Sequence, residues 1–140
     1  MKKIVLAIIA VMVPLMLSAG STDFWFRHFS VEDGLSSSAV RAIMQDKYGF
    51  MWLGTDDGLN RYDGTTIKIY RLNPEGVNDY ISFLYDTTDR IWIGTGDGVY
   101  IYDYETESFE PFKLLTTKGD SIKTNVNHIA EDRDGNLWFS

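Results

Sequence analysis

The chain of 140 residues has no cysteine. It therefore has no disulfide to stabilise its fold and no thiolate to ligate a metal ion. Basic residues are also few: 13 lysines and arginines stand against 20 aspartates and glutamates, which gives a formal net charge of −7. An acidic surface repels the phosphates of nucleic acids, so we expect no nucleic-acid partner.

Long hydrophobic runs are absent after residue 17. The one such run, residues 4–17, follows two lysines and precedes four small residues. This order predicts a cleaved export signal over residues 1–20. A membrane anchor is the alternative, but the run is shorter than the roughly 20 residues that span a bilayer, and Pro14 interrupts it.

Catalytic and metal-binding constellations are also absent from the sequence. His28 and His128 lack the spacing of a zinc-binding helix. Residues 132–136, DRDGN, resemble the start of a calcium loop but lack its distal glutamate. Asp56 and Asp57 lie in a hairpin turn, where aspartate is favoured for its geometry. We therefore expect no metal, no cofactor and no enzymatic activity in this chain.

The chain does contain a repeat. Residues 40–63 read VRAIMQDKYGFMWLGTDDGLNRYD, residues 80–103 read YISFLYDTTDRIWIGTGDGVYIYD, and residues 126–140 read VNHIAEDRDGNLWFS. A period of about 40 to 45 residues with several strands in each unit is typical of the blades of a β-propeller. Simple superposition of the copies aligns Asp46 with Asp86 and Asp132, Trp52 with Trp92 and Trp138, and Gly54 with Gly94.

The pattern within one copy predicts a four-stranded antiparallel blade. Apolar runs predict buried inner strands, and an alternating run predicts a half-exposed outer strand. The pair Asp57-Gly58 predicts a hairpin in which both residues have positive φ. In the first copy the strands are expected at residues 40–44, 51–53, 59–62 and 65–70.

The predicted fold is all-β: a partial β-propeller of four-stranded antiparallel blades, with two blades and the start of a third, preceded by a signal peptide. Residues 23–30 are rich in aromatic side chains and predict a strand that closes the ring by completing the last blade.

Two blades and the start of a third do not close a ring, so we expect the chain alone to be an unstable monomer. The expected segments are 1–20 for the signal peptide, 21–38 for the ring-closing strand and its loop, 39–79 for the first blade, 80–125 for the second, which ends in a loop at 114–125, and 126–140 for the start of the third.

The tryptophans and glycines of the repeat are expected to build the core between blades. They are Trp52, Trp92, Trp138, Gly54 and Gly94, and the tryptophans lie within apolar strands. A sugar-stacking platform is the alternative interpretation of these tryptophans.

Ligand-binding groups are expected in loops, because loops carry function on a rigid scaffold. In a four-stranded blade, the hairpin between the second and third strands shares one face with the loop between blades. Asp56, Asn78 and Asp97 are the polar candidates on that face. The alternative is that they serve only to form turns.

At this point the residues indicate a family. The pattern V-x-x-I/F-x-x-D-x-x-G-x-x-W-L/I-G-T-x-D-G-L/V-x-x-Y-D resembles the two-component regulator propeller repeat, over residues 24–140. The opening F-x-x-F and EDGLSSS are similar to the start of the periplasmic sensor region of hybrid two-component systems. The copies depart from the pattern at Asp89, where the first has Gly49, and at Ser140, where the first has Gly54.

The resemblance implies a function that the repeats alone do not. It implies a periplasmic sensor module that binds glycan-derived oligosaccharides and regulates polysaccharide-utilisation genes through a downstream histidine kinase. The implied partners are an oligosaccharide, the remaining propeller blades and a second copy in a homodimer, with the full-length protein anchored in the inner membrane. Two alternatives remain: an exported propeller enzyme, either a polysaccharide lyase or a glycosidase, and a non-catalytic interaction scaffold.

Overall fold

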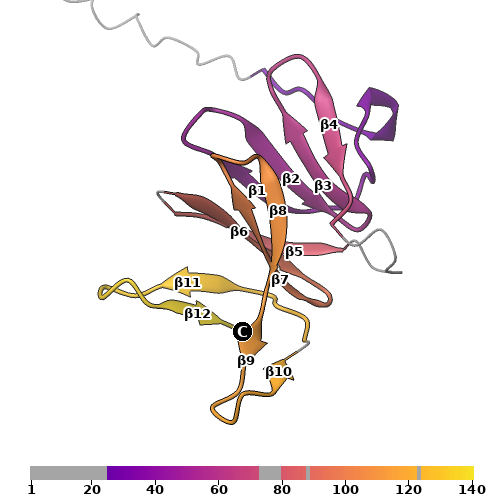
Figure 1. Cartoon of the computed structure of the whole chain (residues 1–140). Coiled ribbons are helices and arrows are strands. Elements are labelled where there is room, and N and C mark those ends of the chain that lie inside the picture. Colours follow the sequence, from indigo (N-terminus) through magenta and orange to yellow (C-terminus); the bar gives the residue numbers. More distant parts are fainter. Residues whose placement is uncertain (1–24, 73–79, 88, 123) are drawn as a thin grey trace, which may run out of the picture.

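The computed structural model describes residues 25–72, 80–87, 89–122 and 124–140 (Figure 1). The predicted signal peptide and Asn78 lie outside these residues. In the described part the chain is almost entirely β, with twelve strands and one short 3-10 helix. Four-stranded antiparallel sheets are its main elements. The predicted fold class is therefore confirmed, apart from the signal peptide.

The first sheet is an antiparallel meander in the order β1-β2-β3-β4. Side chains along β1 alternate between partly buried and exposed, as a strand with one covered face does. A register shift between Val40 and Ala42 bends β1 near its start. The strands are β1 (Val40–Gln45), β2 (Met51–Thr55), β3 (Gly58–Tyr62) and β4 (Ile67–Tyr70).

The second sheet repeats this meander in the order β5-β6-β7-β8, and two further strands begin a third (Figure 1). Its strands are β5 (Ile81–Asp86), β6 (Arg90–Thr95), β7 (Gly98–Asp103) and β8 (Ser108–Phe112). The third copy contributes the pair β11 (Ile129–Glu131) and β12 (Leu137–Phe139).

The loop predicted at residues 114–125 contains a small hairpin, so that prediction is wrong in part. β9 (Leu114–Leu115) pairs with β10 (Ser121–Ile122). Thr116 closes the turn: its N–H donates to the carbonyl of Asp120 at 2.8 Å, and its hydroxyl accepts two backbone N–H groups. A turn rich in threonine, glycine and aspartate satisfies its own backbone in this way, and apolar periodicity gives no sign of it.

The hairpin turn between β2 and β3 also differs from its prediction. Gly58 has a φ of 114°, whereas Asp57 is not among the described residues with positive φ. The turn is therefore not of the type in which both central residues are left-handed. The hydroxyl of Thr55 holds it by donating to the carbonyl of Gly58 at 2.9 Å and accepting the N–H of Asp57 at 3.1 Å.

The ring-closing strand expected at residues 23–30 is not formed in its described part. Residues 25–30 belong to no strand, because no described strand offers them a hydrogen-bonding partner. The side chains of Arg27 and Phe29 instead contact Tyr62 of β3, through a 2.9 Å hydrogen bond and an edge-on ring contact at 4.9 Å. The 3-10 helix η1 (Val31–Asp33) follows, capped at its start by Ser30.

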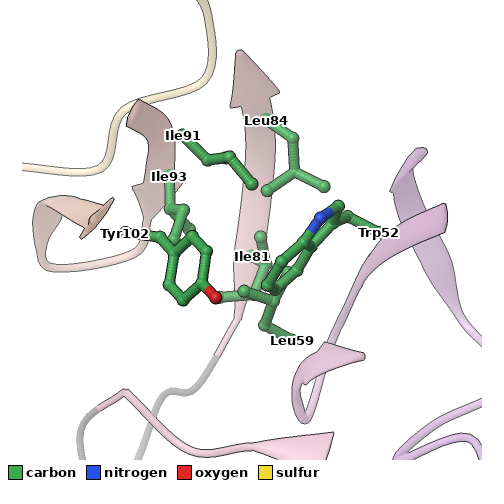
Figure 2. Close-up of a cluster of buried hydrophobic side chains, with 7 residues drawn as sticks. All are labelled: Trp52, Leu59, Ile81, Leu84, Ile91, Ile93 and Tyr102. Carbon is green, nitrogen blue, oxygen red and sulfur yellow. The ribbon is translucent and has the colours of Figure 1, made fainter. Parts of the chain in front are cut away.

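The main core lies between the first two blades. Trp52 and Leu59 of the first blade meet five buried side chains of the second, and Figure 2 shows the seven side chains of this cluster gathered together. The ring centroids of Trp52 and Tyr102 are 5.0 Å apart. The five residues from the second blade are Ile81, Leu84, Ile91, Ile93 and Tyr102.

Two glycines allow the blades to approach this closely. A Cβ on Gly54 would lie 2.5 Å from the Cγ2 atom of Ile81, and a Cβ on Gly94 would lie 2.7 Å from the carbonyl oxygen of Val126. Ile81 begins the inner strand of the second blade, and Val126 precedes that of the third. The second strand of each blade therefore touches the start of the next blade at the same repeat position.

The copies differ in the turn between their first two strands. In the first copy the N–H of Asp46 donates to the carbonyl of Phe50, and in the third the N–H of Asp132 donates to that of Asn136. In the second copy Thr87 takes this place and donates to Arg90, so the turn is one residue shorter. Asp86 is therefore not the structural equivalent of Asp46, contrary to the simple superposition of the sequences.

This difference removes a recurring hydrogen bond from the second copy. The carboxylate of Asp46 accepts the indole N–H of Trp52 at 2.7 Å, and Asp132 accepts that of Trp138 at 2.9 Å. Threonine at position 87 offers no such carboxylate. Asp86 instead accepts the hydroxyl of Tyr104 at 3.0 Å.

The three tryptophans are buried to different extents, and Trp138 departs from the expected core position. Trp52 is 0% exposed, Trp92 is partly buried, and Trp138 is 65% exposed. The first two indoles face the next blade: Trp52 contacts Tyr102, and Trp92 contacts Phe139 at 5.9 Å. Trp138 is exposed because no described strand packs over it.

We expect the substitution Trp52→Ala to destabilise the fold by about 3–5 kcal/mol, as large core truncations do. Trp138→Ala removes an exposed side chain and one hydrogen bond, and we expect a loss of about 0.5–1.5 kcal/mol. Denaturant unfolding measures both. If both variants lose the same free energy of unfolding, the difference in burial between Trp52 and Trp138 has no effect on stability, and the prediction is wrong.

We expect Gly54→Ala to destabilise the fold by about 1–3 kcal/mol, because the new methyl group overlaps Ile81. Combining it with Ile81→Ala tests the cause. If the overlap is responsible, the double variant loses less stability than the sum of the two single variants. Simple additivity in denaturant unfolding would place the cost elsewhere.

Candidate functional site

A pocket of about 420 Å³ lies at one end of the inner strands, and its volume falls within the range of small-ligand sites. It is built by three successive copies of the repeat. The first copy contributes two charged side chains, the second an aromatic ring and a glycine, and the third an amide. These lining residues, called the mouth pocket below, are Arg41, Asp56, Tyr80, Gly96 and Asn125.

An ion pair forms one wall of the mouth pocket. Arg41 projects from the exposed face of β1, and Asp56 begins the β2–β3 hairpin. The guanidinium binds the carboxylate through Nε and Nη2, with Nη2 3.2 Å from Oδ2. The Arg41 side chain is 48% exposed and that of Asp56 is 40% exposed, so both remain accessible to a ligand.

The aromatic ring adjoins this pair. The guanidinium carbon of Arg41 lies 5.0 Å from the centroid of the Tyr80 ring, within the range of a cation–π contact. Tyr80 immediately precedes β5. Arg41 thus joins the hairpin of the first blade to the inner strand of the second.

The ion pair shifts the titration of both groups. The hydrogen bond and charge of Arg41 lower the pKa of Asp56, and the same bond raises the pKa of Arg41. Asp56 therefore remains a carboxylate, a hydrogen-bond acceptor, at any physiological pH. The pKa of Asp57 is also lowered, by a different arginine. Arg71 binds this carboxylate through two nitrogens, and Asp57 does not line the mouth pocket.

The predicted site residues are only partly brought together. Asp56 lines the mouth pocket. Asp97 is exposed in the neighbouring hairpin, at the position equivalent to Asp57, and it is Gly96 that corresponds to Asp56. Asn78 lies outside the described residues.

Sequence reasoning did not name four of the residues that line the pocket: Arg41, Tyr80, Gly96 and Asn125. Arg41 lies in a strand, and its outward position follows from the alternation along β1. Tyr80 and Asn125 precede inner strands, so the start of each copy was the signal that could have identified them.

A second pocket, also of about 420 Å³, lies at the opposite end of the blades. Lys47 places its ammonium nitrogen 4.4 Å from the centroid of the Tyr104 ring, and Tyr48 meets the same ring edge-on at 5.2 Å. Its charges are mixed rather than arranged around a reacting centre. The lining residues are Lys47, Tyr48, Asp89, Arg90, Asp103, Tyr104 and Glu105.

The turn that resembled a calcium loop is filled by its own donors. Asp132 accepts the backbone N–H groups of Asp134 and Asn136, the amide of Asn136 and the indole of Trp138. These bonds, that of Trp138 first, lower the pKa of Asp132 to about 2. The carboxylate therefore orders the turn and the tryptophan.

The sheets, their order and their shared inner-strand contacts define a run of β-propeller blades. Residues 34–57 and 121–140 match the family model of the two component regulator propeller. The resemblance inferred from the repeat is thereby confirmed, and these stretches are repeats of that kind.

The chain is similar to a histidine kinase and to extracellular domains of hybrid two component systems. A histidine kinase named P4 from Formosa agariphila is 56% identical over 59 residues, which are 42% of this chain and 4% of the kinase. An extracellular domain from B. thetaiotaomicron, assigned to the hybrid two component system BT3049, superposes with a TM-score of 0.70 and 31% identity, covering 81% of this chain and 17% of that one. A second extracellular domain from B. thetaiotaomicron, assigned to the hybrid two component system BT4673, superposes with a TM-score of 0.60 and 25% identity. The match covers 86% of this chain and 18% of that one.

The chain therefore spans less than a fifth of each of these extracellular domains. It is similar to a stretch of propeller within them. Among the described residues, no helix has the length and apolar character needed to cross a bilayer.

We expect Asp56 to titrate below the ordinary aspartate value of about 3.9. Because its pKa is lower in the folded than in the unfolded chain, the ion pair contributes to stability above about pH 4, and this contribution is lost as the pH falls through the folded pKa. NMR titration of the carboxyl carbon measures the shift. In Arg41→Gln the pKa of Asp56 returns toward the ordinary value, while that of Asp57, paired with Arg71, stays low; an unchanged Asp56 would disprove the assigned cause.

Proposed function

We propose that this chain is a periplasmic ligand-sensing propeller module of a hybrid two-component sensor. It detects glycan-derived oligosaccharides and regulates the genes for polysaccharide use. The observation that carries the proposal is the mouth pocket, in which three successive repeats each contribute at least one side chain. The similarity to extracellular domains of hybrid two-component systems supports the sensor role.

The chemistry of the mouth pocket suits a sugar. Asp56 offers hydrogen-bond acceptors, Arg41 offers donors, and the amide of Asn125 offers both. Tyr80 adds an aromatic surface beside them. Sugar rings present hydroxyls at their edges and C–H groups on their faces, so this combination matches both parts of such a ligand.

The same groups are poorly suited to cleaving a glycan. A glycosidase needs a carboxylic acid that is protonated near neutral pH, with a second carboxyl group facing it. The pKa of Asp56 is instead lowered by Arg41, and Asp57 is bound to Arg71. We therefore propose a non-catalytic module, with the lyase or glycosidase as the rival.

Signal transfer would follow from the position of the pocket between blades. Arg41 bridges the first hairpin and the second inner strand. A ligand that rearranges these contacts would change how the blades meet, and the change would pass to the rest of an inner-membrane sensor and its downstream kinase. The remaining blades, and a second copy in a homodimer, are the partners of this scheme.

We expect Arg41→Ala and Asp56→Ala to weaken oligosaccharide binding about tenfold or more, since each removes a charged hydrogen-bonding group and leaves its partner unpaired. Isothermal titration calorimetry with a tetrasaccharide panel measures the affinities. Arg90→Ala, which removes an arginine at the opposite end of the blades, is the matched control and leaves the affinity unchanged.

The panel also separates the sensor from its rivals. Cleavage products detected by chromatography would favour the enzyme. Equal affinities in the three variants would move the ligand away from the mouth pocket.

A further inference from the structure

The mouth pocket is built from two equivalent positions of the repeat. In the first copy the N–H of Asp56 donates to the carbonyl of Ala39 at 3.3 Å, and in the second the N–H of Gly96 donates to that of Tyr80 at 3.3 Å. Each bond joins the first residue of the β2–β3 or β6–β7 hairpin to the residue before the inner strand. The backbone is therefore the same in both blades.

The third copy supplies the same position before its inner strand. Its first turn has the same length as that of the first copy, since Asp132 and Asp46 make the same backbone hydrogen bond four residues on. Counting back from these aspartates places Asn125 at the position of Ala39. Asn125 is exposed and lines the pocket.

Side chains at these two positions change while their surroundings do not. The threonine before each hairpin is kept and donates to the same carbonyl, Thr55 to Gly58 at 2.9 Å and Thr95 to Gly98 at 3.1 Å. The glycine before it is kept for the blade contact. The two positions beside this shared frame differ between the copies. The residue before the inner strand is Ala39, Tyr80 or Asn125, and the first residue of the hairpin is Asp56 or Gly96.

Within each of the first two blades, a small residue at one of these positions is combined with a larger side chain at the other. The first blade combines a small residue before its strand, Ala39, with a carboxylate in its hairpin, Asp56. The second combines a large ring before its strand, Tyr80, with no side chain in its hairpin, Gly96. Each of these two blades thus presents one functional side chain over the pocket, from one position or the other.

We propose that these two repeat positions, called the reading positions below, determine which oligosaccharide is bound. Each blade supplies one side chain that contacts the ligand from a reading position. The inference rests on the proposed function of the mouth pocket and adds its specificity. Asp56 and Asn125 select the arrangement of hydroxyls on a sugar ring, and Tyr80 selects a ring that presents a C–H face. Changing the residue at a reading position changes the preferred sugar while the frame stays intact.

The test exchanges the reading residues between blades. Tyr80→Ala with Gly96→Asp gives the second blade the residues of the first, and Ala39→Tyr with Asp56→Gly does the reverse. Calorimetry on the purified protein measures affinities for cellotetraose, xylotetraose, mannotetraose and tetragalacturonic acid. Circular dichroism checks the fold, and Asn125→Ala, at an exposed position, is the variant used where an exchange does not fold.

We expect the ratio of affinities between at least two tetrasaccharides to change by about tenfold or more. Tyr48→Ala, which removes an exposed tyrosine at the opposite end of the blades, is the matched control and leaves all ratios unchanged. A uniform weakening toward every tetrasaccharide, or no change, overturns the specificity role and leaves the proposed function standing. If the unaltered protein binds none of the four, the proposed function is overturned and this inference with it.

Discussion

The structure depends on the close contact between the second strand of one blade and the start of the next blade. Gly54 and Gly94 occupy the same repeat position, and each lies against the first part of the next blade, where a side chain would collide with Ile81 or with the carbonyl of Val126. The contact fixes the spacing between blades. That spacing in turn lets Trp52 fill the gap farther along the strands, where it is 0% exposed. Neighbour contacts of this kind, rather than the interior of any one sheet, stabilise a repeat array.

The aspartate–tryptophan hydrogen bond is a secondary device, and the copies show that it is dispensable. Asp46 and Asp132 hold their indoles, yet the second copy, with Thr87 in that place and a shorter turn, keeps the same four-stranded meander. The carboxylate orders a turn and aims a ring, whereas the burial of that ring comes from the blade beside it. Trp138 keeps the hydrogen bond and is still 65% exposed.

The sequence predicted the fold well because the repeat is carried by local signals: apolar strands, turn residues and a recurring tryptophan. It predicted the details less well where they depend on register or on neighbours. The superposition that placed Asp86 on Asp46 ignored a turn one residue shorter, a change that hydrogen bonds reveal and side-chain types conceal. The site was found only in part: the place of the hairpin on the loop face of the blade pointed to Asp56, but the pocket also needs Arg41 and Tyr80, which come together only when two blades pack.

The repeat also explains how the proposed sensor would change its ligand without losing its fold. The glycine that lets one blade approach the next is tied to its position by steric contact and is the same in both complete copies, as Gly54 and Gly94. Residues at the two repeat positions over the mouth pocket share one backbone arrangement, as the hydrogen bond from Gly96 to the carbonyl of Tyr80 shows. Their side chains are not part of that backbone frame, and the copies carry an aspartate, a tyrosine and an asparagine at these positions. Because the backbone holds the frame, the side chains over the mouth pocket can vary one blade at a time.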